Sequence, residues 1–185
     1  MIVLFIGVSL FVAIHLLPSF PSIRNSVVDS LGEGKYKGLY SLMALAGLIL
    51  MIYGKAEADF VPIWTPPMWT RYIVWVTMLP ALILVVAANM PGNIKRFTPH
   101  PMMWSVLLWS LAHLMANGDQ ASIVLFAPLC AFSIIHIFTA NARGAKVQTE
   151  VLVASTDVKV LAIGLATYAI FAVAHPYLFK VVAFY

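Results

Sequence analysis

The sequence contains few charged residues. Aspartate, glutamate, lysine and arginine together make up 10% of its 185 residues, whereas 62% of the residues are hydrophobic. An ordinary soluble domain has about 25% charged and roughly 45–50% apolar residues. This composition excludes a soluble globular protein and indicates a chain that lies in a lipid bilayer.

Cysteine is almost absent, and the basic residues are dispersed. The single cysteine, Cys130, allows no intrachain disulfide and no zinc-binding thiolate cluster. The 11 basic and 7 acidic residues give a net charge of +4, but the basic ones are scattered between apolar stretches. We therefore predict no nucleic-acid partner, because nucleic-acid binding requires basic residues clustered on one surface.

The acidic residues all lie outside the apolar stretches, so no carboxylate pair is available at membrane depth for acid–base hydrolysis or for a di-metal site. They are Asp29, Glu33, Glu57, Asp59, Asp119, Glu150 and Asp157. The Gly-x-Ser-x-Gly, Gly-x-Gly-x-x-Gly and His-Glu-x-x-His motifs are also missing. These absences argue against a serine hydrolase, a dinucleotide enzyme and a zinc protease.

Six apolar stretches are long enough, or nearly long enough, to cross a bilayer, which takes about 20 helical residues. They cover residues 1–17, 39–54, 72–90, 101–116, 120–141 and 158–183. The sequence predicts an all-α fold, a polytopic membrane helical bundle of five to six transmembrane helices that forms one domain over residues 1–185. The first stretch lacks a preceding basic residue and a following cleavage site, so we expect it to be a retained helix.

Prolines indicate where two of these helices begin or end. Pro18 and Pro21 should end the first helix, because proline has no N–H to donate. Pro101 suits the first turn of the fourth helix, where that N–H would be unpaired.

The lysine and arginine residues predict the orientation. Cytoplasmic loops of membrane proteins carry an excess of these residues. Eight lie in the first, third and fifth loops, namely Arg24, Lys35, Lys37, Lys95, Arg96, Arg143, Lys146 and Lys159, whereas Lys55, Arg71 and Lys180 lie on the opposite side. The bias predicts that both termini are periplasmic.

All five histidines lie in or at the ends of the predicted helices. His15 and His136 lie near the cytoplasmic ends of the first and fifth helices, and His100 begins the fourth. His113 lies deep in the fourth helix and His175 in the outer half of the sixth. Imidazoles without carboxylate or thiolate partners suit a buried haem.

The fourth predicted helix has a polar and aromatic stripe. Residues four apart share a helix face, so Ser105, Trp109, His113 and Asn117 line up. His100 lies thirteen residues before His113, which places it about 20 Å away along the axis and on nearly the opposite face. These two histidines cannot ligate one iron together.

An ordered series of short motifs resembles the NnrU family of bacterial inner-membrane proteins. The series is His15-Leu-Leu-Pro-Ser, Leu31-Gly-Glu, Tyr36-Lys-Gly-Leu-Tyr-Ser, Leu79-Pro, Pro91-Gly-Asn-Ile-Lys, His100-Pro-Met and Leu111-Ala-His-Leu-Met-Ala-Asn-Gly-Asp. The resemblance implies a multi-pass protein of the bacterial inner membrane that is linked to nitric oxide reductase and denitrification. The family is also similar to the zeta-carotene isomerases, which contain haem b.

The resemblance to the isomerases implies that His15 and His113 ligate a haem b iron and that His100 is also required. Asn117 and Trp109 would then surround this cofactor site. Depth in the membrane gives a different pairing: His15 lies about two residues and His113 about twelve residues from the cytoplasmic boundary, an offset of about 15 Å. By depth, His15 pairs with His100 or His136. We nevertheless favour His113 as the second ligand, because its stripe provides polar and aromatic neighbours that His100, at the water boundary, lacks.

We therefore expect a lipid-embedded haem protein that acts in nitrogen-oxide metabolism or isomerises an apolar small-molecule substrate. An alternative is a non-catalytic accessory protein that docks against a membrane reductase complex through small residues such as Ala44-x-x-Gly47. A weaker alternative is a membrane methyltransferase, which the His100-Pro101 dipeptide resembles. That enzyme's acidic–arginine cofactor motif is absent after the fifth helix.

Overall fold

The computed structural model describes residues 1–179, which form seven α-helices and two short 3₁₀ helices. The helices are α1 (Ile2–Leu16), α2 (Pro21–Leu31), α3 (Glu33–Ala56), α4 (Thr70–Asn89), α5 (Pro101–Ala116), α6 (Gln120–Ala142) and α7 (Ala154–Phe179), with η1 (Leu17–Ser19) and η2 (Asn93–Arg96). The spans that include α1, α3, α4, α6 and α7 are long and apolar enough to cross a membrane, and α5 is a shorter apolar helix of 16 residues. The predicted all-α membrane bundle is confirmed.

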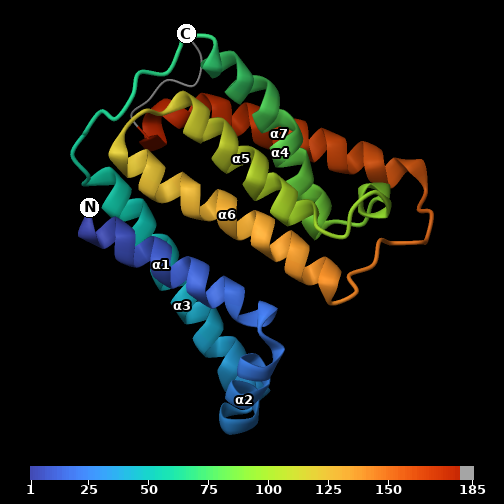
Figure 1. Ribbon diagram of the computed structural model, residues 1–185. Helices are drawn as coiled ribbons and strands as arrows, with labels where there is room; N and C mark the ends of the chain where they lie inside the picture. The colour runs from blue at the N-terminus through green and yellow to red at the C-terminus, as the bar shows by residue number, and fades with distance from the viewer. Residues whose placement is uncertain (180–185) are drawn as a thin grey trace.

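The membrane helices pack as a row. Each contacts mainly its neighbours in the order α3, α1, α6, α5, α4 and α7. Figure 1 shows α6 running across the bundle, with α1 and α3 on one side and α5, α4 and α7 on the other. Many large apolar side chains are exposed on this row, as expected for surfaces that face lipid.

Glycines bring α1 and α3 into close contact. A Cβ at Gly7 would lie 2.6 Å from the Met51 nitrogen, and one at Gly47 would lie 2.9 Å from the Phe11 nitrogen. Small residues allow membrane helices to approach this closely. Gly47 is buried against α1, so the expectation that Ala44-x-x-Gly47 offers a free docking face is wrong at Gly47.

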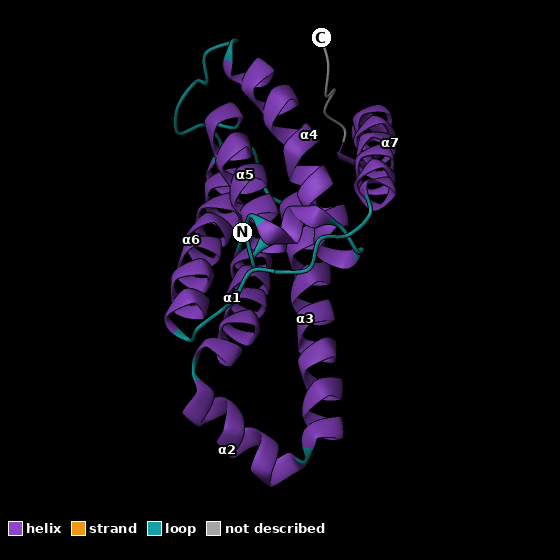
Figure 2. Ribbon diagram, turned by 90° about the vertical axis from the view of Figure 1, so that its right-hand side faces the viewer, coloured by secondary structure: helices purple, strands orange, loops and turns teal. Residues whose placement is uncertain are grey.

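Helix α2 and the start of α3 differ from the sequence prediction. Residues 21–31 form a helix that begins with Pro21 in its first turn and ends at Gly32, whose φ of 78° suits glycine. Figure 2 shows α2 at the far end of α1 and α3. Helix α3 begins at Glu33, six residues before the predicted apolar stretch, because apolar composition marks only the part of a helix that suits lipid. The Glu33–Lys37 ion pair, 2.9 Å long, stabilises this polar first turn.

The remaining boundaries follow the prediction closely. Helix α1 ends at Leu16, just before Pro18, and Pro101 lies in the first turn of α5. The sixth predicted stretch corresponds to α7, which begins at Ala154, and its residues 180–183 lie outside the described residues.

The two ends of the bundle carry different loops. We call the end with residues 17–32, 90–100 and 143–153 the histidine end, and the end with residues 57–69 and 117–119 the Lys55 end. At the histidine end, Asn93 ties η2 to α7: its backbone N–H donates to Asp157 Oδ1 and its Nδ2 to Asp157 Oδ2, both at 2.7 Å. Asn93 also exchanges two hydrogen bonds with the Leu152 backbone, which fixes the loop between α6 and α7.

Candidate functional site

His15 lies in the last turn of α1. Its Nδ1 lies 2.7 Å from the carbonyl oxygen of Phe11. A carbonyl only accepts, so Nδ1 carries the proton and Nε2 keeps its lone pair, as in a histidine that is ready to ligate a metal. The ring packs against Phe11, Tyr40 and Phe132 at centroid distances of 4.0, 5.5 and 6.0 Å.

Two further histidines are linked to His15 through a chain of ring contacts. The His136 ring lies 5.9 Å from the Phe132 ring, which also contacts His15, and 6.3 Å from the His100 ring. The Nδ1 atom of His136 is buried and has no hydrogen-bond partner. His100 is buried, and its Nε2 lies 2.7 Å from Oδ1 of Asn141. We call His15, His100 and His136 the three-histidine cluster.

A pocket of about 440 Å³ adjoins this cluster. Residues from α4, η2, α5, α6 and the following loop line it: Ala88, Lys95, Pro99, His100, Pro101, Met102, Met103, His136, Lys146, Val147 and Gln148. A volume of 300–1,000 Å³ is typical of small-molecule sites. Two of the three clustered histidines therefore border a space that is large enough for a ligand.

His113 occupies a separate position. Its Nδ1 donates to the Trp109 carbonyl at 2.8 Å, so its Nε2 also keeps a lone pair. The His113 ring packs against Phe126 and Trp109 at 4.9 and 5.7 Å, and it interacts electrostatically with His175 of α7. Asn117 ends α5 and donates from Nδ2 to the His113 carbonyl at 2.8 Å.

The positions along α6 separate His113 from the three-histidine cluster. His15 contacts Phe132, whereas His113 contacts Phe126, six residues or about 9 Å away along the helix axis. Within residues 1–179, ring contacts join His15 indirectly to His136 and do not join it to His113. Of the two histidines that the depth argument favoured, His136 shares the neighbour Phe132 with His15, and His100 contacts His136.

The directions in which His100 and His113 face differ from the sequence expectation. Both rings contact α6, His100 through His136 and His113 through Phe126, and so they do not face opposite sides. The reason is that His100 is the N-cap of α5, with φ −125° and ψ 46°. Its backbone is not helical, so the rotation of about 100° per helical residue does not predict the direction of its side chain. Their separation along the bundle agrees with the expectation.

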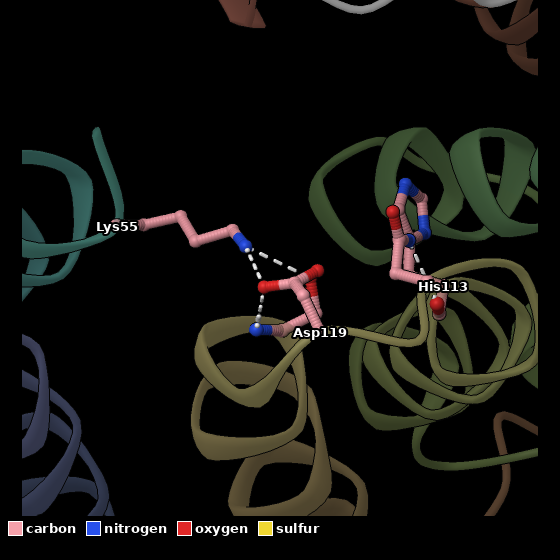
Figure 3. Close-up of polar contacts among 5 residues, drawn as sticks. Lys55, His113 and Asp119 are labelled. Carbon is pink, nitrogen blue, oxygen red and sulfur yellow. Dashed lines mark hydrogen bonds and ion pairs between the residues drawn. The ribbon is translucent and has the colours of Figure 1, made fainter. Parts of the chain in front are cut away.

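A buried ion pair at the Lys55 end was not foreseen from the sequence. Lys55 Nζ lies 2.8 Å from Asp119 Oδ1 and donates to Ser122 Oγ at 2.8 Å, which joins α3 to the start of α6 (Figure 3). Asp119 also accepts from the Ser122 backbone N–H at 2.9 Å and so caps α6. Burial raises the pKa of Asp119, but hydrogen bonds from Lys55 and Ser122 outweigh burial and hold this pKa below its ordinary value.

The loop before α4 covers this ion pair. The Ile63 and Trp64 N–H groups donate to the Gly118 carbonyl at 2.7 and 3.1 Å, and the Gln120 N–H donates to the Val61 carbonyl at 2.9 Å. Backbone hydrogen bonds therefore join the loop before α4 to the start of α6 at the Lys55 end, whereas the pocket beside His100 and His136 lies at the histidine end.

Among residues 1–179, no three histidine, cysteine, aspartate or glutamate side chains are placed to hold one metal ion together. A haem iron needs only one or two ligands from the protein, because its macrocycle supplies the other donors.

Comparison with known families shows a match over most of the chain. The family described as NnrU protein matches residues 3–183, which is nearly the whole chain. Neither the curated proteins nor the solved structures contain a match.

Proposed function

Because the chain belongs to the NnrU family, we propose that this membrane protein binds one haem b at the three-histidine cluster. It uses the haem in nitrogen-oxide metabolism or in the isomerisation of an apolar substrate. When bound, the haem supplies an iron that exchanges electrons or takes a small ligand. The residues of this chain hold the iron and keep its surroundings apolar.

The unpartnered Nδ1 of His136 carries this proposal. A buried polar atom without a hydrogen bond is costly, and such an atom in a native structure calls for an explanation. A metal–nitrogen bond would remove this cost. His15, on the other side of the shared neighbour Phe132, offers Nε2 in the tautomer that ligates metals.

In this proposal His15 and His136 would hold the haem iron through their ring nitrogens, and His100 would position the His136 ring. His100 contacts the His136 ring and is itself held by Asn141. The isomerase resemblance implies a different pair, His15 and His113. That pair would require the His113 ring to move along α6, away from its contact with Phe126 and toward His15. Phe11 and Phe132 pack against the His15 ring, and aromatic rings suit the flat face of a porphyrin.

Absorbance spectroscopy of the protein purified from haem-replete cells tests the proposal. We expect a Soret band and the sharp reduced-state bands of a six-coordinate b-type centre. His15→Ala and His136→Ala should each abolish the low-spin bands, whereas the matched variant His113→Ala should keep them.

Three results would contradict parts of this assignment. A protein that stays colourless after haem titration removes the haem proposal and favours the accessory role beside a membrane reductase complex. Loss of the low-spin bands in His113→Ala, with His136→Ala unchanged, restores the His15–His113 pair. Retention of these bands in His15→Ala removes His15 from the site.

The same proposal places the protein in the bacterial inner membrane with its histidine end in the cytoplasm. The excess of lysine and arginine in the loops of that end supports this orientation. Reporter fusions after Ala145 should read as cytoplasmic, and fusions at Ala58 and at the C-terminus should read as periplasmic. The reverse pattern would place the three-histidine cluster near the outer surface.

A further inference from the structure

The pocket at the histidine end combines basic and apolar lining. Lys95 and Lys146 line it from η2 and from the loop after α6, while Ala88, Met102 and Met103 supply apolar wall from α4 and α5. None of the lining residues is acidic. A pocket with this lining suits a ligand that is anionic at one end and apolar at the other.

The two lysines are available to such a ligand. Within residues 1–179 the ion pairs are Lys37–Glu33 and Lys55–Asp119, so neither Lys95 nor Lys146 is in one. The backbone keeps the two lysines beside the same space, because the Gln148 N–H donates to the Lys95 carbonyl at 3.0 Å.

The start of α5 adds a second attraction for an anion. Pro101 occupies the first turn, and the N-cap His100 makes no capping hydrogen bond through its side chain. The N–H groups of Met102 and Met103 therefore have no partner within the helix, and both residues line the pocket. The positive end of a 16-residue helix dipole and free amide groups favour carboxylate or phosphate.

We propose that this pocket binds an amphiphile through its acidic head group. The head group, a carboxylate or a phosphate, lies between Lys95, Lys146 and the start of α5. The apolar chain lies along Met102, Met103 and Ala88, toward the lipid. Basic pockets between membrane helices bind lipid head groups by the same combination of contacts. The inference concerns the lysines and does not require haem.

Native mass spectrometry of the full chain in a neutral detergent tests the proposal. Oleate provides a carboxylate, dioleoyl phosphatidate provides a phosphate, and oleyl alcohol is the uncharged match for oleate. We expect oleate or phosphatidate to bind more tightly than oleyl alcohol. Lys95→Gln combined with Lys146→Gln should weaken binding of the acid about tenfold or more, since charge-assisted hydrogen bonds are lost. The preferred acid identifies the head group.

Two control variants test whether the position and the charge of the two lysines matter for binding. Lys35→Gln combined with Lys37→Gln removes the same charge from exposed positions at the same end and should leave binding unchanged. Lys95→Arg combined with Lys146→Arg keeps the charge and should retain most of the affinity. Circular dichroism of each variant checks that the helices are intact.

Three outcomes would overturn the proposal. In the first, the double glutamine variant binds both acids as tightly as the unaltered protein. In the second, oleyl alcohol binds as tightly as oleate. In the third, the double glutamine variant loses haem absorbance while its oleate affinity stays unchanged, which would assign the lysines to haem propionates. A colourless protein that binds oleate through these lysines supports the proposal and contradicts only the haem assignment.

Discussion

The ion pair between Lys55 and Asp119 gives a quantitative test of the bundle's packing. The Asp119 side chain is 8% exposed and the Lys55 side chain 33% exposed. Asp119 makes three contacts at once, because it pairs with Lys55, accepts from Ser122 and caps α6. Replacing Asp119 should therefore destabilise the protein more than replacing a surface carboxylate.

The magnitude follows from these contacts. Asp119→Ala loses an N-cap, which costs about 1 kcal/mol. It also leaves the Lys55 charge without its partner, a loss that we take as about 1–3 kcal/mol because Lys55 is partly solvated. Asp119→Asn keeps a capping oxygen and loses only the charge. We expect losses of about 2–4 kcal/mol for Asp119→Ala and about 1–2 kcal/mol for Asp119→Asn in the free energy of unfolding.

A double-mutant cycle with Lys55→Met isolates the pair. The combined variant Lys55→Met/Asp119→Asn should lose less stability than the sum of its single variants, by about 1 kcal/mol or more. Unfolding by sodium dodecyl sulfate titration in mixed micelles, followed by circular dichroism, measures each value. Additive losses would refute the conclusion that the two side chains stabilise each other.

The pH dependence provides an independent check. The folded protein holds the pKa of Asp119 below its ordinary value of 3.8, so its contribution is fully present above that value. The contribution is lost as the pH falls through the lower pKa of the folded state. The unaltered protein should therefore lose stability below about pH 4, and Asp119→Asn should lack this part of the decline. Equal declines in the two proteins would contradict the assigned pKa.

Three further variants test other contacts. Gly54→Ala places a Cβ against the Leu4 backbone and should destabilise the α1–α3 pair by about 1–3 kcal/mol, whereas Gly38→Ala, with open space around it, should be neutral or slightly stabilising in the same titration. Gly118→Ala meets the carbonyl of the facing loop and should increase proteolytic cleavage within residues 57–69. Asp157→Ala removes both side-chain contacts to η2 and should speed hydrogen exchange in the loop between α6 and α7, and unchanged exchange would contradict this role.

The sequence predicted the membrane helices well because lipid imposes a simple requirement. A helix that crosses a bilayer must satisfy its backbone hydrogen bonds internally and must be apolar over about 20 residues. A polar helical segment outside the lipid has no such apolar stretch, so residues 33–38 and α2 were not predicted as helical. Their local signals are the proline at the start of α2 and the glycine after it, at position 32.

The site could be predicted only in part, because depth can be counted from a sequence but lateral neighbours cannot. The family resemblance paired His15 with His113, whereas counting residues from the helix ends paired His15 with His100 or His136. In the structure, ring contacts link His136 directly to His100 and, through Phe132, to His15. The ion pair between Lys55 and Asp119 joins residues 64 apart in the sequence, and no spacing rule connects two helices. The order of the helices in the row, which decides such contacts, is a property of the whole bundle.

The difference between the two ends of the bundle places ligand entry at the histidine end. At the Lys55 end, a ligand would have to break the ion pair and the backbone hydrogen bonds between residues 61–64 and 118–120. At the histidine end, the pocket already reaches His100 and His136 from the loops, past Lys95 and Lys146. A ligand in this pocket lies beside both lysines and both imidazoles, and it breaks no contact that holds α3 to α6. The proposed acidic amphiphile and the proposed histidine-bound cofactor would therefore approach the chain from the same side. A change at the lysines should then alter access to the histidines before it alters the stability of the bundle.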